Sequence, residues 1–509
     1  MVSESLVGRV SAGIAAVTCV ALYLEARGLS PKKLRRPLAA LLMFASVATY
    51  FHFFEFRAGA FYHRWEMFHY FLGSKYAEEL GFDRLYTCSA LAEAEAGDRA
   101  RVMARRMRDL QNDTIIPAAS ALSDPQACRA HFSAARWQAF KDDAEFFRRT
   151  AGTLSWQQMQ LDHGYNPAPS WTLLGRALSE RLPASHRTLS ALALIDPLLM
   201  AGALALLGWA FGARVAFLAT VFWGTQAASA FSWTGGAFLR QDWLFLVVLS
   251  LALLRKGKPF WAGAALAWAA SLRLFPLLLF AGPALVVLAS LWRTRRWLAP
   301  QRSFLVGAAL ALGLSLGATL LAFGPRYHRE FAAHIAMHAA TPVANHMSLR
   351  SLFSIGPEAL IRNNQASRAI DPTERWAKAR RGHFERFRWA YWLSVAALLA
   401  FFVLTVWRVR TLWVALALSL LPVMLFTDPS SYYFSLWLVA APVVLVRPVL
   451  TLPFIGLAAA SQLLSVQVAD MDIKFAVLAA LYLTFSTILV CAFARRDFGL
   501  ARFVQNTAR

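Results

Sequence analysis

WAYWLSVAALLAFFVLTVW, residues 389–407, is an apolar run without a charged side chain. A helix of about 17–25 apolar residues crosses the hydrocarbon core of a bilayer, so this run is long enough to span a membrane. Similar runs recur along the whole chain. They cover residues 6–26, 37–54, 190–211, 215–233, 242–254, 259–275, 277–292, 303–323, 411–426, 432–446, 449–468 and 475–494. We therefore expect an all-α, polytopic membrane protein of about 13 transmembrane helices, with residues 1–509 as a single membrane domain.

The connections between the runs differ in charge. Basic residues gather on alternate short connections, for example around Lys32, Arg255 and Arg408, and the positive-inside bias assigns these connections to the cytoplasm. The other connections then face outward. Two of them are long: residues 55–189 form the expected first extracytoplasmic loop, and residues 324–388 the second.

The first long loop carries periodic sequence of its own. Apolar and charged residues at helical spacing predict amphipathic helices at residues 65–86, 91–110 and 133–150, with Gly81 ending the first. These helices would form a helical extracytoplasmic cap. Cys88 and Cys128 both lie in this loop, and they either pair in an oxidising compartment or remain two thiols.

The basic composition fits a membrane protein better than a nucleic-acid-binding protein. The chain is 58% hydrophobic, and its formal net charge is +23. The positive charges lie at the ends of apolar runs, where they orient helices and meet anionic lipid. We therefore expect membrane lipids, and no nucleic acid, among the partners.

One charge lies deep inside an apolar run. Arg273 interrupts residues 265–280, ALAWAASLRLFPLLLF, and Pro276 breaks the helix beside it. An arginine at membrane depth costs at least about 2.5–3.5 kcal/mol unless it reaches water, a partner or an anion. The residue therefore indicates either an anion-binding site or a structural pair with a carboxylate.

Arg240 and Gln241 follow two glycines at the outward end of another apolar run. Their hydrogen-bond donors suit a phosphate or hydroxyl ligand. The alternative is an interfacial loop in which Arg240 pairs with Asp242.

The best candidate for a general base is Glu66. It shares one helix face with His69 and Tyr70, three and four residues on. A carboxylate beside aromatic groups near a membrane surface suits proton abstraction. Glu55, at the end of the second apolar run, competes for this role, and a salt bridge to Arg57 or Arg64 is the structural alternative for either acid.

Further polar residues are expected at the same outward face, either as substrate contacts or as solvated loops. Hydroxyl, amide and guanidinium donors suit a phosphate or a sugar. These residues are Asp162, His163, Tyr165, Asn345, His346, Ser348, Arg350, Tyr432 and Tyr433.

The sequence offers little support for a cofactor. His334 and His338 have the spacing of two zinc ligands on a helix, but no nearby carboxylate or cysteine completes a site, so no metal is assigned. The sequence has no Walker loop, GxSxG elbow or dinucleotide fingerprint at a place where the neighbouring sequence would support the motif. An enzyme that works at the outer face has no access to cytosolic nucleotide sugars, so it needs an activated donor that resides in the membrane.

Several of these residues follow one another as in a known family. They are Glu66, Tyr70, Gly81, Leu85 and Tyr86, then Tyr165 and Pro167, then Gln241, then Arg273 and Pro276, then Asn345, Ser348 and Leu349, and last the turn Asp428 to Tyr433. In this order the chain resembles the GT-C membrane glycosyltransferases, and most of all the family that uses polyprenyl-phosphate mannose (glycosyltransferase family 87). That family usually has Asp in place of Glu66 and Lys in place of Arg273, and residues 88–149 have no counterpart in it.

The resemblance implies an inverting transfer of a mannose-like sugar from a polyprenyl-phosphate donor to a hydroxyl of a glycan, lipid or protein acceptor. It implies that Glu66 is the base, with Glu55 as its competitor. It also implies that the protein lies in a bacterial inner (plasma) membrane, with the active site on the extracytoplasmic side. Donor phosphate binding falls to Arg273, Arg240 and Arg350. Substrate binding falls to His69, Tyr70, Gln241, Asp162, His163, Tyr165, Asn345, His346, Ser348, Tyr432 and Tyr433.

Two other functions fit the same residues. A lipid-linked glycan ligase of the same superfamily would use the late loop, with His334, His338 and Arg350. A transporter for an anionic substrate would use Arg273 and Arg240 as a site near the midplane, beside the break at Pro276.

Overall fold

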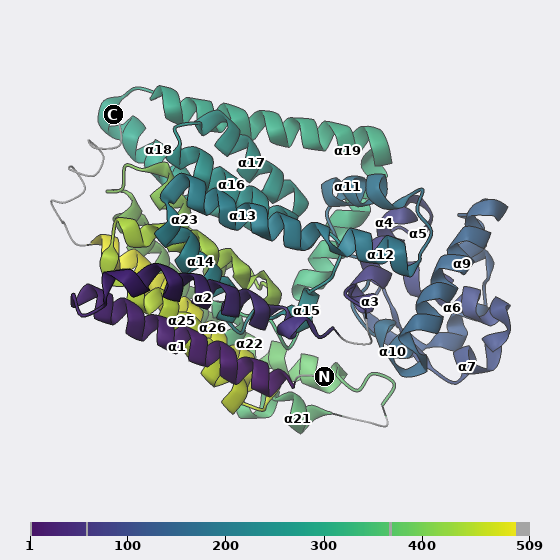
Figure 1. Ribbon diagram of the computed structural model, residues 1–509. Helices are drawn as coiled ribbons and strands as arrows, with labels where there is room; N and C mark the ends of the chain where they lie inside the picture. The colour runs from purple at the N-terminus through teal and green to yellow at the C-terminus, as the bar shows by residue number, and fades with distance from the viewer. Residues whose placement is uncertain (1–2, 57–59, 366–368, 495–509) are drawn as a thin grey trace.

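The computed structural model describes residues 3–56, 60–365 and 369–494, and within them nearly all regular structure is helical (Figure 1). In this part of the chain the exception is a short antiparallel pair, β1 (Arg106–Asp109) and β2 (Thr114–Pro117). Within the described ranges, seven helical segments are long and apolar enough to cross a membrane, which indicates an integral membrane protein. They are Glu4–Ala26, His186–Phe211, Phe275–Thr294, Ala299–Ala340, Glu374–Val406, Pro448–Gln467 and Met471–Ala494.

Each expected apolar run falls on a helix, but several of these helices are short. α16 (Asp242–Arg255) and α17 (Pro259–Leu272) have 14 residues each, and α14 (Ala213–Thr225) has 13. A 14-residue helix rises about 21 Å, less than the hydrocarbon thickness of about 30 Å. Thirteen complete crossings therefore remain a prediction.

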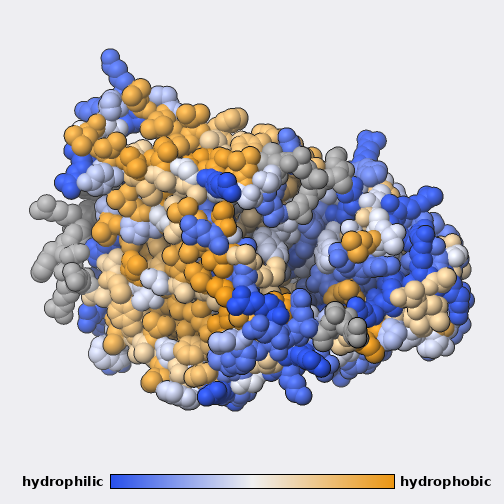
Figure 2. Space-filling model, turned by 90° about the horizontal axis from the view of Figure 1, so that it is seen from below, coloured by the Kyte–Doolittle hydropathy of each residue, from blue (hydrophilic) through white to orange (hydrophobic). Residues whose placement is uncertain are grey.

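The long helices pack side by side in one bundle (Figure 1). α17 lies between α16 and α19 (Ala299–Ala340), and α13 (Ile195–Phe211) packs against both α14 and α16. α1 (Glu4–Ala26) packs along α25 (Thr451–Gln467). Apolar side chains cover much of this bundle in Figure 2.

At one end of the bundle a separate group of short helices forms a lobe with a hydrophilic surface (Figures 1 and 2). We call residues 64–159, which run from α3 (Arg64–Met67) to α10 (Thr153–Met159), the polar lobe. Phe68, Phe140, Phe147 and Trp156 form its buried core. Two buried ion pairs, Lys75–Asp143 at 2.6 Å and Arg105–Glu93 at 2.7 Å, fasten its helices together.

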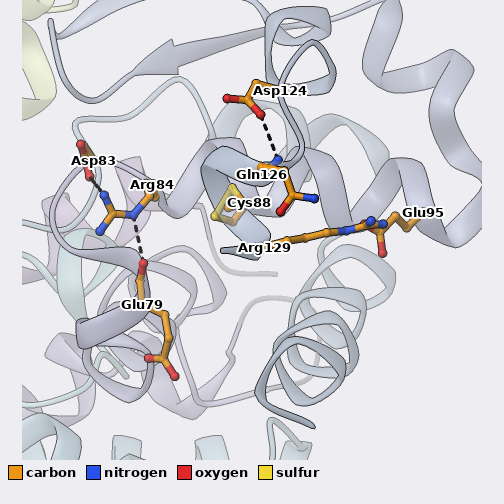
Figure 3. Close-up of a disulfide and its surroundings, with 9 residues drawn as sticks. Glu79, Asp83, Arg84, Cys88, Glu95, Asp124, Gln126 and Arg129 are labelled. Atoms are coloured by element: carbon orange, nitrogen blue, oxygen red, sulfur yellow. Dashed lines mark hydrogen bonds and ion pairs between the residues drawn. A yellow bond between two sulfur atoms is a disulfide. The ribbon is translucent and has the colours of Figure 1, made fainter. Parts of the chain in front are cut away.

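A disulfide joins Cys88 on α6 (Leu85–Glu93) to Cys128 on α8 (Gln126–Arg129). Of the two alternatives that the sequence left open, the structure therefore has the bridged form. Arg84 and Arg129 flank the bridge, paired with Asp83 at 3.4 Å and with Glu95 at 2.5 Å (Figure 3).

Inside the lobe one predicted helix is wrong. Residues 91–110 do not form a single helix, because Gly97 adopts a positive φ of 100° and kinks the chain after α6, and residues 106–109 pair as strand β1. The helix expected at residues 133–150 is present as α9 (Ala134–Ala151). The helix expected from residue 65 is interrupted at Tyr76, which has φ −115° and ψ 32°, and its last segment, α5 (Ala77–Leu80), ends at Gly81 with φ 55° as predicted.

The second long connection is more helical than expected. α19 continues beyond its apolar part through a kink at Gly324, which has φ 72° and is followed by Pro325. α22 (Glu374–Val406) begins well before the apolar residues that start at position 389. The irregular link between them carries the short helix α20 (Leu349–Phe353).

Candidate functional site

Glu66 lies buried on α3, and its partner is Arg240. The Nε of Arg240 donates to Glu66 Oε2 at 2.5 Å, and the two residues are 5% and 9% exposed. Among the described residues this pair takes the place of the expected salt bridge to Arg64, and the same expectation for Arg57 lies outside the described residues. A charge-assisted hydrogen bond in a buried setting fixes both side chains in place.

The loop that carries Arg240 is held by its backbone. Asp196, near the start of α13, accepts hydrogen bonds from the backbone N–H of Arg240 at 2.9 Å and of Gln241 at 3.0 Å. The indole N–H of Trp171 donates to the carbonyl of Leu239 at 3.0 Å, where φ is +51°. These contacts hold a turn in which Leu239 has a positive φ, a conformation that a leucine rarely adopts.

Arg273 lies at the end of α17, in extended backbone with φ −142° and ψ 128°. The helical turn Phe275–Phe280, with Pro276 near its start, follows. The predicted helix break is therefore present, and it sets the guanidinium group of a 7% exposed arginine against aromatic rings rather than against lipid.

Both guanidinium groups lie near the ring of Tyr70. The Cζ of Arg240 is 4.0 Å from the centre of the Tyr70 ring, and the Cζ of Arg273 is 5.7 Å from it. Arg240 also lies 5.1 Å from the ring centre of Tyr432. Cation–π contacts of this kind stabilise arginines that have left water. We call Glu66, Tyr70, Arg240, Arg273 and Tyr432 the arginine cluster.

Polar atoms in and beside the arginine cluster remain without hydrogen-bond partners among the described residues. They are Arg240 Nη1, Arg273 Nε, Gln241 Oε1 and Asp242 Oδ2. Leaving a buried polar group unpaired costs about 1–3 kcal/mol, so such a concentration is unusual in a purely structural core. Two of the four are guanidinium donors, which suit an anionic oxygen.

Asp162 and His163 belong to a neighbouring polar network. Asp162 Oδ2 accepts from the indole N–H of Trp65 at 2.5 Å, and His163 Nδ1 lies 2.9 Å from Asp113 Oδ1. Burial acts to raise the pKa of Asp113, but the hydrogen bond from His163 and the charge of Arg108 outweigh it and hold that pKa well below its usual range.

His69 and Tyr165 are held by contacts within the protein. His69 Nδ1 lies 2.8 Å from the carbonyl of Trp65, and its Nε2 lies 2.6 Å from the Tyr86 hydroxyl. The Tyr165 hydroxyl donates to Thr172 at 2.8 Å, while its ring packs near Tyr70. These two residues therefore support the shape of the site.

The residues expected from the late loop gather around Asp428. Its carboxylate pairs with Arg350 at 3.2 Å and accepts from the Ser348 hydroxyl. The backbone N–H of Ser431 donates to the carbonyl of Asn345 at 2.9 Å, and His346 pairs with Ser430. The turn that follows carries Tyr432 to Arg240 and Tyr433 against Trp243 and Phe275, so the late loop and the arginine cluster share one turn.

Glu55 lies elsewhere. It is exposed and lines a hollow of about 320 Å³ together with Arg64, Trp65 and Phe231. Of the two carboxylates proposed as base, only Glu66 therefore contacts an arginine of the arginine cluster in the described structure. Within residues 3–56, 60–365 and 369–494, no group of three or more His, Cys, Asp or Glu side chains could hold a metal ion.

Sequence reasoning missed Asp196 and Trp171, which hold the Arg240 loop. Asp196 did carry a signal, since an acid in the apolar run that follows Leu194 needs a buried partner. No family model, curated protein or solved structure matches the chain. The interpretation of the site therefore depends on its geometry.

Proposed function

We propose that the protein is a membrane glycosyltransferase that moves a mannose-like sugar from a polyprenyl-phosphate donor to an acceptor hydroxyl. The acceptor is a glycan, lipid or protein, and the reaction takes place at the extracytoplasmic face of a bacterial inner membrane. The observation that carries this proposal is the arginine cluster, in which two buried guanidinium groups share one tyrosine ring beside a carboxylate.

The two arginines would hold the donor phosphate. Arg240 Nη1 and Arg273 Nε are buried donors without partners among the described residues. α16 begins at Asp242, directly after Arg240 and Gln241, so the positive end of its helix dipole adds to the same potential. Charge placed where the leaving phosphate develops its negative charge lowers the barrier to its departure.

Glu66 would serve as the base once the donor is bound. In the structure its carboxylate neutralises Arg240. A donor phosphate competes for the same guanidinium group, and when it binds there, Glu66 is released to accept the proton of the acceptor hydroxyl. The acceptor oxygen then attacks the anomeric carbon, the bond from that carbon to the phosphate oxygen breaks, and polyprenyl phosphate leaves. A single displacement of this kind inverts the anomeric configuration.

The experiment that tests this function compares two matched carboxylate variants, Glu66→Gln and Glu55→Gln. Purified protein in vesicles is given radiolabelled polyprenyl-phosphate mannose with glycan and lipid acceptors from the source membrane. Loss of a general base lowers turnover by about 10²–10⁴-fold, so Glu66→Gln should be nearly inactive while Glu55→Gln keeps most of its activity. If both variants transfer sugar at the normal rate, Glu66 is not the base, and Asp242 becomes the next acid to test.

One observation favours an anion transporter as the second candidate. The break between α17 and the turn Phe275–Phe280 at Arg273 is the kind of discontinuous helix that transporters place at a substrate site. The same vesicles separate the two functions: a transporter moves inorganic phosphate or an organic phosphate across the membrane without forming a glycoside. The third candidate, a lipid-linked glycan ligase, would depend on Arg350 and His338 rather than on Glu66.

The proposal includes a topology. The polar lobe and the link between α19 and α22 face outward, the short helices α14, α16 and α17 complete the predicted set of crossings, and the carboxyl terminus lies in the cytoplasm. The separation of a hydrophilic lobe from an apolar bundle supports this arrangement (Figure 2).

A further inference from the structure

The amino-terminal part of α22 is strongly basic. Residues 374–388 read ERWAKARRGHFERFR, with six Lys and Arg residues against two Glu, and the apolar part of the helix follows directly. In the proposed topology this stretch faces outward, opposite to the basic connections of the cytoplasmic side. Long connections translocate largely regardless of their charge, so an outward position of this stretch is compatible with its basic residues but is not explained by them. Another role has to be sought.

Two adjoining hollows lie between this stretch, the late loop and the end of α24 (Leu420–Phe426). They share three lining residues, Arg350, Phe384 and Asp428. The first is also lined by Arg380 and Arg381, and the second has a volume of about 290 Å³. The remaining residues that line the second hollow are Glu385, Arg388, Tyr391, Trp392, Leu425, Phe426 and Thr427.

The polar part of these hollows carries an excess of positive charge. Four arginines, Arg350, Arg380, Arg381 and Arg388, face two acids, Asp428 and Glu385. Arg380 is 5% exposed; it pairs with Asp472 at 2.9 Å, yet its Nε has no hydrogen-bond partner among the described residues. A buried donor of this kind beside exposed arginines suits an anionic oxygen.

The lower part of the second hollow is apolar and lies where α22 enters its apolar section. Trp392 and Phe426 line it, and they are 49% and 42% exposed. Trp389 and Leu393, on the same helix, are 70% and 64% exposed. Tryptophans concentrate at the depth of lipid headgroups, so the arginines above them lie at the level of lipid phosphates.

We propose that this groove binds an anionic phospholipid, with its phosphate between Arg350, Arg381 and Arg388 and an acyl chain along Trp392 and Phe426. The ligand is a lipid of the surrounding membrane rather than the sugar donor. A reacting phosphate needs shielded cations such as Arg240 and Arg273. The side chains of Arg350 and Arg388, by contrast, are 38% and 59% exposed and are paired with acids, as suits a headgroup that exchanges without reacting.

The test uses two double variants of the full chain that change charge equally on one helix. Arg381→Gln with Arg388→Gln removes two groove arginines seven residues apart, which share a helix face. Arg375→Gln with Arg386→Gln removes two exposed arginines outside both hollows and serves as the control. All four side chains are exposed, so both variants should fold, and thermal unfolding verifies this.

Native mass spectrometry then measures retention of phosphatidylglycerol, phosphatidylcholine or polyprenyl phosphate by each protein. We expect the variant with Arg381→Gln and Arg388→Gln to retain at least tenfold less phosphatidylglycerol than the wild-type protein. The control variant should retain as much as the wild-type protein. Equal loss in both variants would assign the effect to diffuse charge and overturn the site. The site would also be overturned if the wild-type protein retained phosphatidylcholine as well as phosphatidylglycerol. The same holds if the groove variant lost only polyprenyl phosphate. Sugar transfer is not the readout, so the outcome is independent of the proposed function.

Discussion

An arginine that is 7% exposed, as Arg273 is, needs compensation for the water that its guanidinium group has lost. The structure supplies it through the rings of Tyr70 and Trp171, at 5.7 and 5.3 Å from the Cζ atom, and leaves Nε without a partner among the described residues. Aromatic faces lower the cost of burial but do not neutralise the charge. We propose that the phosphate of a lipid-linked donor supplies the missing partner.

Replacing Arg273 tests that conclusion. Arg273→Met removes the charge and keeps much of the apolar stem, so affinity for a polyprenyl-phosphate donor should fall by about 1.5–3 kcal/mol, the worth of a charge-assisted hydrogen bond. Arg273→Lys keeps the charge and should retain part of the affinity. Donor binding is measured by isothermal titration in detergent. Normal binding by the Met variant would make Arg273 a structural charge.

Asp113 provides a pH-dependent prediction. Its φ of +53° is a conformation that Asn also tolerates, so Asp113→Asn removes the charge without backbone strain. The pKa of Asp113 is depressed in the folded protein, chiefly because the hydrogen bond from His163 outweighs the effect of burial. A depressed pKa contributes stability that is fully present above the unfolded value of about 4 and is lost as the pH falls towards the folded value. The variant should therefore unfold at a lower temperature near neutral pH, and the difference should narrow below about pH 4. A difference that stays constant with pH would contradict this role.

In the arginine cluster, the sequence predicted which residues needed partners but did not identify the partner residues. Arg240, Arg273 and Glu66 could each be identified from a charge in apolar surroundings. The pairing of Glu66 with Arg240 joins residues 174 apart, and no local pattern encodes it. Asp196 and Trp171 were missed because their roles are hydrogen bonds to the backbone of a distant loop.

Among the elements, α4 (Gly73–Lys75) packs at glycines against Tyr165 and against α11 (Pro169–Ser179), which follows Tyr165 in the chain. A Cβ atom on Gly73 would lie 2.2 Å from the Tyr165 ring, and one on Gly175 would lie 2.9 Å from Trp171 and from Ser74. Trp171 is the residue that stacks on Arg273. The close approach of these two helices therefore also positions the arginine cluster.

Gly73→Ala should disturb that approach. The added methyl group forces Tyr165 to move, and overpacking of this kind costs about 1–3 kcal/mol. We expect a lower unfolding temperature together with weaker donor binding. Gly382→Ala is the matched control, because it lies on α22 with nothing within 4 Å of the added Cβ, and there alanine should leave stability unchanged or slightly higher. Equal unfolding temperatures for the two variants would show that α4 and α11 adjust freely.

The pattern of apolar runs predicted where helices lie far better than how long they are. Every run carries a helix, yet α17 ends at Leu272 and α14 at Thr225, after only 14 and 13 residues. Hydrophobic periodicity and composition indicate that a helix is buried. They do not distinguish a helix buried inside the bundle from one buried in lipid. The failed helix at residues 91–110 has a different cause, since a single glycine, Gly97, redirected the chain.

For the whole molecule, the topology can be tested by labelling. After Cys19 and Cys491 are replaced by alanine, Ala135→Cys places a thiol on an exposed position of α9, and Arg296→Cys places one on the connection between α18 (Ala281–Thr294) and α19. An impermeant maleimide should label Ala135→Cys in intact cells and Arg296→Cys only after permeabilisation. The reverse pattern would place the arginine cluster on the cytoplasmic side and remove the reason for a lipid-linked donor.

The disulfide of the polar lobe has a consequence for the biogenesis of the chain. Cys88 and Cys128 are 40 residues apart, and the chain between them forms α7 (Arg99–Met103) and both strands of the only sheet in the described residues. Structural disulfides form in oxidising compartments and not in a reducing cytosol. In the proposed topology, maturation of the lobe therefore waits until its segment has been translocated. Because Glu66 and Tyr70 belong to the same lobe, the newly made protein would stay inactive until export and oxidation were complete.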